Sequence, residues 1–218
     1  MKNIEILYED DNIIVVNKPA GLAVQGGEGV KTSLDKIFAE IRTPKPLLVH
    51  RLDKDTSGVL LAAKGRENAA RFSRLLNSPE ITKQYTAICA GRPKNEKGVI
   101  NDKLLIHGKL KNSETGYKVL KTSVFSEENL EYSALELELG TGRMHQIRRH
   151  LAMNGNPVLG DDKYGDFTLN KKLRKSAGLK RLLLHASRLI IKDSFNLDIR
   201  APLPEYFSCF YDQRIDNT

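Results

Sequence analysis

The densest group of potentially reactive side chains lies directly before an apolar stretch of the chain. Residues 50–57 (HRLDKDTS) bring together an imidazole, a guanidinium, two carboxylates and two hydroxyls. Residues 59–63, which follow, are all apolar, and such a run predicts a strand that is buried on both faces. Polar groups held at the end of a rigid element can form a preorganised site. We therefore expect this loop to carry catalytic or binding residues.

Asp53 and Asp55 each have two explanations. A carboxylate can act as a nucleophile at a glycosidic carbon or as a general acid or base. An aspartate before Thr-Ser-Gly is also common in turns, where its side chain accepts backbone N–H groups. The chemistry of the residues alone favours the turn for both.

A second polar group occupies residues 140–151 (GTGRMHQIRRHL), after an alternating stretch at residues 135–139. The alternation predicts a strand with one wet face, and the glycine-flanked turn predicts that a helix follows and ends at Gly155. The start of this helix carries no acidic residue, and helix N-termini favour anions. The segment predicts an anion-binding surface, unless a carboxylate arrives from elsewhere, or simply a basic exposed helix.

Apolar periodicity predicts several further elements. Strands are expected at residues 4–8, 13–17 and 81–91. Thr32 and Asp35 form a capping-box pattern before an amphipathic helix, and residues 66–76 show the apolar stripe of a second helix. Residues 99–125 give hairpin-like signals without a clear assignment.

The chain is basic, with a formal net charge of +8 and a pI of about 9.4 over its 218 residues. A basic surface attracts phosphate backbones, so RNA or DNA is the expected partner. One segment without acids concentrates this charge, although such runs are often only solvated. Its cations are Lys171, Lys172, Arg174, Lys175, Lys180 and Arg181.

The rest of the composition narrows the class of protein. No apolar run is long enough to span a membrane, and residues 1–5 do not resemble a secretory signal, so we expect a cytoplasmic protein. Cys89 and Cys209 are isolated from each other and from histidine clusters. They predict neither a disulfide nor a zinc site, and we expect both to be small buried core residues.

The polar segments together resemble the RluA-type pseudouridine synthase family. The resemblance runs from about residue 6 to residue 204, and the segment before residue 4 has no room for the N-terminal S4 module of many members. Its motifs are residues 17–21 (NKPAG), 50–53 (HRLD) with TSG at 56–58, 83–87 (KQYTA), 141–148 (TGRMHQIR), 154–165 (NGNPVLGDDKYG) and 183–186 (LLHA).

The resemblance implies roles for individual residues. Asp53 matches the catalytic aspartate, Tyr85 the tyrosine that stacks on the target base, and Arg148 the arginine that pairs with the aspartate. An ion pair would keep Asp53 charged in a pocket from which water is excluded. Asp55 matches no family role and is expected to form the turn. Contacts with the substrate or RNA are implied for Arg51, Thr56, Arg143, His145, Gln146 and Leu184.

The resemblance also implies a fold and a reaction. We expect a single mixed α/β catalytic domain over residues 1–218, with a largely antiparallel central sheet, flanking helices and an active-site cleft. The reaction would isomerise uridine to pseudouridine in structured ribosomal or transfer RNA, without a metal, nucleotide or redox cofactor. We expect a monomer.

Two other functions fit parts of the sequence. A non-catalytic RNA-binding protein would use the basic segment at residues 171–181 and could dispense with Asp53. A nucleoside hydrolase or glycosidase would use Asp53 and Asp55 as paired carboxylates, would release free base, and would suffer equally from the loss of either.

Overall fold

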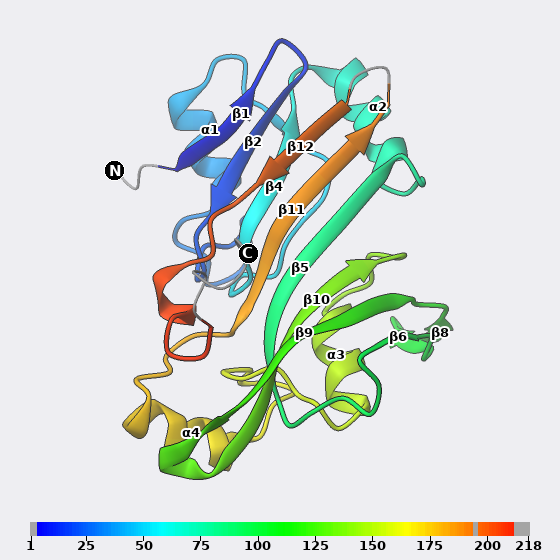
Figure 1. Cartoon of the computed structure of the whole chain (residues 1–218). Coiled ribbons are helices and arrows are strands. Elements are labelled where there is room, and N and C mark those ends of the chain that lie inside the picture. The colour runs from blue at the N-terminus through cyan, green and yellow to red at the C-terminus, as the bar shows by residue number, and fades with distance from the viewer. Residues whose placement is uncertain (1–3, 194–195, 212–218) are drawn as a thin grey trace. The chain divides into compact units, whose positions relative to one another are not determined.

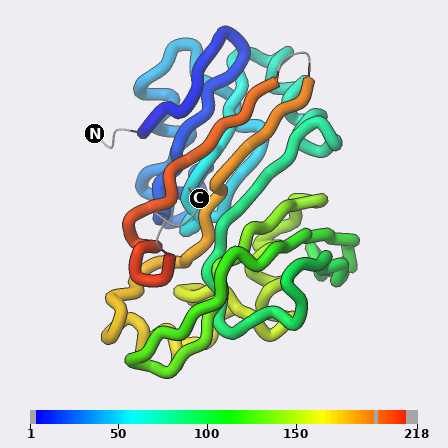
Figure 2. Tube along the Cα trace, in the orientation of Figure 1, coloured from blue at the N-terminus to red at the C-terminus, as the bar shows by residue number. Residues whose placement is uncertain are grey.

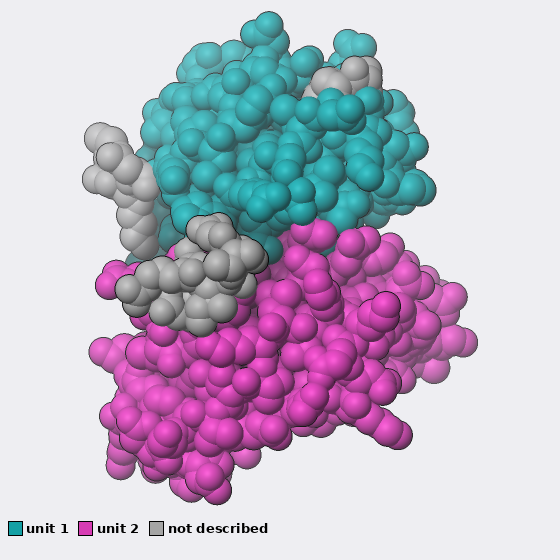
Figure 3. Space-filling view, in the orientation of Figure 1, with its two compact units in different colours: residues 1–83, 186–202 teal, residues 84–185, 203–218 magenta. Residues whose placement is uncertain are grey.

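The strand predicted at residues 59–63 is β4 (Ser57–Ala63) of the computed structural model, and all seven of its residues are buried. The structure describes residues 4–193 and 196–211 (Figure 1). It divides into two compact units: unit 1 contains residues 1–83 and 186–202, and unit 2 contains residues 84–185 and 203–218 (Figure 3). Ten strands of the described chain belong to one mostly antiparallel sheet. The predicted mixed α/β class is confirmed.

Unit 1 contains the predicted N-terminal hairpin beside the buried strand. Its strands are β1 (Glu5–Glu9), β2 (Ile13–Lys18), β3 (Leu47–Leu48), β4, most of β11 (Leu184–Lys192) and β12 (Asn196–Arg200). Antiparallel pairs join β1 to β2, β2 to β4, β3 to β4 and β11 to β12, and the β1–β2 hairpin is blue in Figure 2. The register places Lys18 opposite Gly58. The end of β2 therefore lies beside the start of β4, next to the polar loop.

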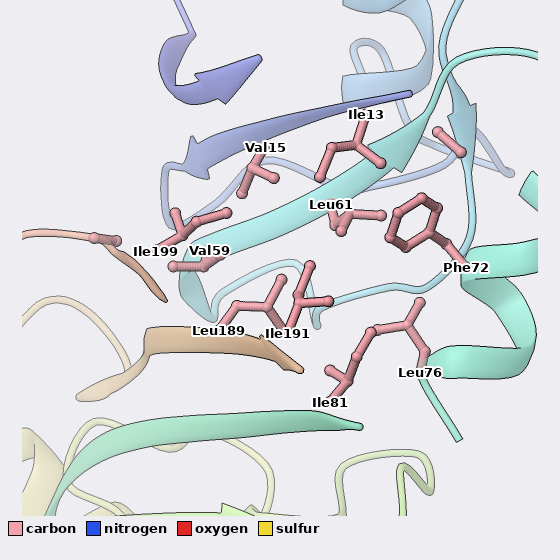
Figure 4. Close-up of a cluster of buried hydrophobic side chains, with 12 residues drawn as sticks. Ile13, Val15, Val59, Leu61, Phe72, Leu76, Ile81, Leu189, Ile191 and Ile199 are labelled. Atoms are coloured by element: carbon pink, nitrogen blue, oxygen red, sulfur yellow. The ribbon is translucent and has the colours of Figure 1, made fainter. Parts of the chain in front are cut away.

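The core of unit 1 forms because alternate residues of β2 and β4 point to the same face. Val59 and Leu61 of β4 pack there with Phe72 of helix α2 (Arg66–Leu75), and Figure 4 shows these side chains together. Burial of each such side chain contributes about 1.5–3 kcal/mol. The remaining buried members are Ile13, Val15, Ala63, Leu76, Ile81, Leu189, Ile191, Ile199 and Ala201. This core gives the polar loop before β4 a rigid base.

Helix α1 (Leu34–Ile41) begins one residue later than predicted. Its N-cap is Ser33, whose hydroxyl accepts the backbone N–H of Lys36, so the prediction of a Thr32 cap is wrong. Leu34, the first residue of the helix, is buried, and Ser33 directly before it has a hydroxyl of the kind that caps helices.

Unit 2 has strands in the order β5, β10, β9, β6. Its elements include most of β5 (Ile81–Ala90), β6 (Lys97–Ile100), β9 (Thr115–Phe125), β10 (Leu130–Leu139), the separate hairpin of β7 (Leu104–Ile106) and β8 (Lys109–Lys111), helices α3 (Gln146–Met153) and α4 (Phe167–Ser176), and the short 3₁₀ turns η1 (Ser126–Glu128) and η2 (Glu205–Phe207). Within β10, Leu135 and Leu137 are buried while Glu138 is exposed. The predicted alternation is confirmed. Residues 99–125, which had no clear assignment, contain the end of β6 and the strands β7, β8 and β9.

The core of unit 2 corrects one of the two cysteine predictions. Its buried members are Ile88, Tyr132, Ala134, Leu159, Leu173, Leu179, Leu183, Phe207, Phe210 and Tyr211. Cys89 is buried as predicted, but Cys209 is exposed, because Phe207 and Phe210 take the inward positions on either side of it. The single domain over residues 1–218 stays a prediction. No helix of the described chain is long and apolar enough to cross a membrane.

Candidate functional site

The loop that carries Asp53 is fixed to the end of β2 by a buried lysine. Lys18 is completely buried, and its Nζ donates to the backbone oxygens of Pro19 (3.0 Å), Leu22 (2.9 Å) and Lys54 (3.0 Å). The oxygen of Lys54 also accepts the N–H of Gly21 at 2.9 Å. The segment after β2 and the loop before β4 thus meet at a single carbonyl.

Lys18 also supplies positive charge beneath the two carboxylates. Burial lowers the pKa of Lys18 to about 8, although the charges of Asp55 and Asp53 oppose the change. At neutral pH Lys18 therefore stays protonated, and it attracts both carboxylates without contacting solvent. Asp53 and Asp55 are themselves half-buried.

The loop turns tightly into β4. The N–H of Thr56 donates to the oxygen of Asp53 at 3.2 Å, which closes a turn between the two residues. Two residues later Gly58 has a φ of 110°, and a Cβ there would lie 2.1 Å from the backbone oxygen of Ala186. Only glycine fits this position, so the direction in which the chain leaves the loop is determined by backbone packing.

Thr56 lies inside this turn. It is 2% exposed, and its Oγ1 is the one buried side-chain oxygen or nitrogen among the described residues without a hydrogen-bond partner. A contact between Thr56 and RNA stays a prediction.

His50 is a structural group and not a charged one. Its Nε2 accepts the N–H of Leu61 at 2.9 Å, which continues the pairing that β3 makes with Ala62 and Ala63 of β4. Burial, with a smaller effect from the charge of Lys83, lowers the pKa of His50 to about 4. The imidazole is therefore neutral at physiological pH.

The His50 geometry predicts a pH dependence of folding stability. Between about pH 4 and 6.5 the unfolded chain binds a proton on His50 that the native chain does not, so the free energy of unfolding should fall as the pH is lowered through this window. The difference between the pKa of His50 in the unfolded and the native chain corresponds to about 3 kcal/mol in the free energy of unfolding. Denaturant unfolding at pH 6.5 and 4 should show this extra loss in the wild type but not in His50→Gln, whose amide oxygen does not titrate. Equal losses would contradict this effect.

Gln146 anchors the turn before α3. Its Oε1 accepts from the hydroxyl of Thr141 (2.7 Å) and the N–H of Arg143 (3.0 Å), and its Nε2 donates to the oxygen of Glu114 (2.8 Å) and Oγ1 of Thr115 (3.0 Å). All four hydrogen-bonding positions of the amide are used within the protein. Gln146 therefore stabilises the turn. Its predicted contact with RNA stays a prediction.

Arg148 pairs with a carboxylate that lies far from the loop of Asp53 in the sequence. Its Nε and Nη2 donate to the two oxygens of Asp161 at 2.7 and 2.8 Å, and Arg148 and Asp161 are 5% and 1% exposed. Burial alone would raise the pKa of Asp161, but hydrogen bonds from Arg148 and from the backbone of Tyr164 and Lys163 outweigh it and hold the pKa below its ordinary value. The start of the helix was predicted to lack acidic residues of its own, and Asp161 is the carboxylate that binds there from another part of the sequence.

An aromatic side chain packs against Arg148 of this pair. Arg148 lies over the ring of Tyr164, with 5.2 Å between the guanidinium carbon and the ring centre. The hydroxyl of Tyr164 is 2.9 Å from Nδ1 of His145. His145 has a φ of 53° and stands directly before α3, so the left-handed residue and Tyr164 together set where the helix begins.

The predicted site residues fall in both units. Arg51, Asp53 and Thr56 belong to unit 1, and Tyr85, Arg143, His145, Gln146, Arg148 and Leu184 belong to unit 2. Within unit 2 the structure brings four of them together around the start of α3: Arg143, His145, Gln146 and Arg148. The predicted pair between Asp53 and Arg148 joins different units and stays a prediction.

The remaining predicted residues differ in exposure. Arg51 and Arg143 are exposed, and Arg143 donates through Nε to the oxygen of Asn112 at 3.3 Å. Tyr85 is 8% exposed and lies opposite Leu137 in the β5–β10 pair. Leu184 is 3% exposed at the start of β11. The arginines are accessible to a polyanion, whereas Tyr85 and Leu184 lie mostly within the protein.

Two structurally important residues received no role from the sequence. Lys18 ends a strand that begins with four apolar residues. A lysine in such a strand is unusual, and this was the feature of the sequence that could have identified it. Asp161 is followed by Asp162 in a segment that starts with Gly160 and ends with Gly165. This segment belongs to the motif at residues 154–165, but the resemblance implied no role for Asp161. Within the described chain, no three His, Cys, Asp or Glu side chains are grouped so that they could hold a metal ion.

The chain is similar to several known proteins. A family model described as RNA pseudouridylate synthase matches residues 12–153. The chain is 35% identical to the ribosomal large subunit pseudouridine synthase C of Rickettsia typhi, over 93% of this chain and 69% of that protein. Solved structures with the same fold include the human RNA pseudouridylate synthase domain containing 4, with a TM-score of 0.78, 28% identity and coverage of 94% and 90% of the two chains. The structure of the human RNA pseudouridylate synthase domain containing 1 is also similar, with a TM-score of 0.77 and 27% identity. It covers 95% of this chain and 88% of that chain.

Proposed function

Since the chain belongs to the RNA pseudouridylate synthase family, we propose that it isomerises particular uridines of large-subunit ribosomal RNA, with Asp53 as the catalytic carboxylate. The enzyme class is that of an isomerase acting on RNA. Curated relatives are named for the large ribosomal subunit, and this favours ribosomal over transfer RNA as the substrate. We place the reaction in the cytoplasm and assign it to a monomer.

The reaction rearranges one nucleotide without a net change in its atoms. The N1–C1′ glycosidic bond breaks, the uracil turns, and C5 bonds to C1′; C5 then loses its proton and N1 ends with one. Asp53 acts at the sugar as the nucleophile or the base. Carboxylates perform both tasks at glycosidic centres, and each needs the ionised form.

The observation that carries this proposal is the fixation of the Asp53 loop by buried Lys18. Three carbonyls bind its ammonium group, one of them from Lys54 beside Asp53. A carboxylate on such a loop reaches its substrate with little loss of conformational freedom. His50 cannot compete as the base near neutral pH in this arrangement, because its Nε2 already accepts the N–H of Leu61.

Tyr85 and Arg148 of unit 2 would complete the site. A uracil in folded RNA must be extruded from its stack at a cost of a few kcal/mol, and stacking on one aromatic ring returns about 1–3 kcal/mol. We assign that stacking to Tyr85. We assign to Arg148 the stabilisation of the charged form of Asp53, a role it would share with its binding of Asp161.

Mapping pseudouridine in cellular RNA tests the proposed substrate. We expect cells that lack the gene to lose pseudouridine at one or a few positions of large-subunit ribosomal RNA, and the wild-type gene to restore them. Losses confined to transfer RNA would contradict the choice of substrate. With purified enzyme and unmodified transcript, release of free uracil in place of pseudouridine would identify a hydrolase instead.

A further inference from the structure

Helix α4 and the residues after it carry a dense group of exposed cations in unit 2. We call this group the α4 basic surface; its members are Lys171, Lys172, Arg174, Lys175, Lys180 and Arg181, all exposed. Among the described residues, no carboxylate lies within ion-pair distance of the four cations on the helix. The charges of these four helix side chains are therefore available to an external partner.

The spacing of these cations does not stabilise helix α4. Lys171 and Lys175 are four residues apart, and Lys171 and Arg174 are three apart, so like charges are neighbours on the helix surface and repel one another. Only Arg174 and Lys175 lie in the last turn, where the helix dipole favours cations. Helix stability therefore does not account for Lys171 and Lys172.

The helix is held firmly in unit 2. Leu173 is fully buried in the core of the unit. The side chain of Asn170 accepts the N–H of Gly160 and donates to the oxygen of Asp161, each at 2.9 Å. Asp161 is the carboxylate that binds Arg148, so α4 is fixed to the turn that positions this arginine.

An exposed aromatic ring accompanies the cations. Phe167, the first residue of α4, is 66% exposed. Phe167, Lys171 and Arg174 have the spacing i, i+4 and i+7, so they share one side of the helix. Cations beside an aromatic face are the combination that binds single-stranded nucleic acid, because the cations neutralise phosphates and the ring stacks on a base.

Acidic groups near the helix are fewer than the cations. The 3₁₀ turn η1, which carries Glu127 and Glu128, contacts α4 (Figure 1). Asp166 caps the helix and accepts the N–H of Leu169. The acids of η1 and the N-cap are thus fewer than the six cations of the α4 basic surface.

We propose that the α4 basic surface is a second RNA-binding surface, which binds phosphates of the substrate RNA in addition to the contacts made at the target uridine. This inference rests on the proposed function, since RNA is its ligand. Binding at a surface fixed to the turn of Asp161 would hold the RNA in a constant position relative to Arg148. It would also add affinity that does not depend on the identity of the target base.

The test compares two double variants that remove the same charges. Lys171→Gln/Arg174→Gln removes cations that have no carboxylate partner. The matched control is Lys45→Gln/Arg42→Gln, which removes one lysine and one arginine that already pair with Asp35 and Glu9 at 3.0 Å. The probe is unmodified large-subunit ribosomal RNA transcript, with its affinity for the full chain measured over a range of salt concentrations.

We expect the slope of log K against log salt to become shallower by about 2 in the α4 variant, about 1 for each cation, and to stay unchanged in the control. Phe167→Ala should leave the slope unchanged and weaken binding by about five- to 150-fold, the equivalent of one stacked base. Equal slopes for the two double variants would overturn the proposal. If that result came with lost binding of the α4 variant to intact large ribosomal subunits, the partner would be an acidic protein. A shallower slope from an enzyme that forms no pseudouridine in this transcript would support the α4 surface and overturn the proposed substrate.

Discussion

Asp53→Asn is expected to abolish pseudouridine formation while RNA binding survives. Asparagine keeps the shape of the side chain but removes its charge, its nucleophilicity and its basicity, and the loss of such a group costs on the order of 10⁴-fold in turnover. The loop should keep its conformation, because Lys18 holds it through backbone carbonyls and not through the carboxylate. Single-turnover rates and RNA affinities, measured on the same preparations, check both parts.

Asp55→Asn is the matched control for this variant. Asp55 lies two residues away, is also half-buried, and also interacts with the charge of Lys18. The two substitutions therefore change the charge of the loop equally. Asp55→Asn should keep most of the activity. Comparable rates for both variants would remove the catalytic role from Asp53, and equally severe losses would favour a pair of carboxylates.

Much of unit 1 was predictable because its signals are local. The apolar run before Lys64 identifies β4, and the paired strands around residues 10–12 identify the hairpin. The polar residues before β4 could be recognised as a site, although residue chemistry could not choose between turn and catalysis for Asp53. That choice depended on the resemblance to a family.

Elements and contacts that depend on distant residues were missed. In β9 only Thr115 is buried, so the apolar alternation that marks a strand is weak, and its pairing with β10 forms it. Lys18 acquires its role from Lys54, 36 residues away. No local pattern encodes such a contact, because the backbone carbonyl that it needs is present at every residue.

Arg148→Met is expected to cost far more than Arg149→Met, in stability as well as in turnover. The first substitution leaves Asp161 buried without its partner, which costs about 3–5 kcal/mol. Arg149 donates only an exposed hydrogen bond to the oxygen of Leu105, worth about 1 kcal/mol. Both positions lie in α3, and arginine and methionine have similar helix propensities. Denaturant unfolding should show the difference, and equal destabilisation would contradict the importance of the buried pair.

Asp161→Asn separates the structural role of Arg148 from a role in the reaction. It breaks the same ion pair, yet its amide oxygen can still accept the N–H groups of Lys163 and Tyr164. Both single variants should therefore lose stability, but only Arg148→Met removes the cation assigned to Asp53. We expect Arg148→Met to lose more turnover per folded molecule than Asp161→Asn. If the two variants lose turnover equally, Arg148 acts by holding the turn of Asp161 in place and not through Asp53.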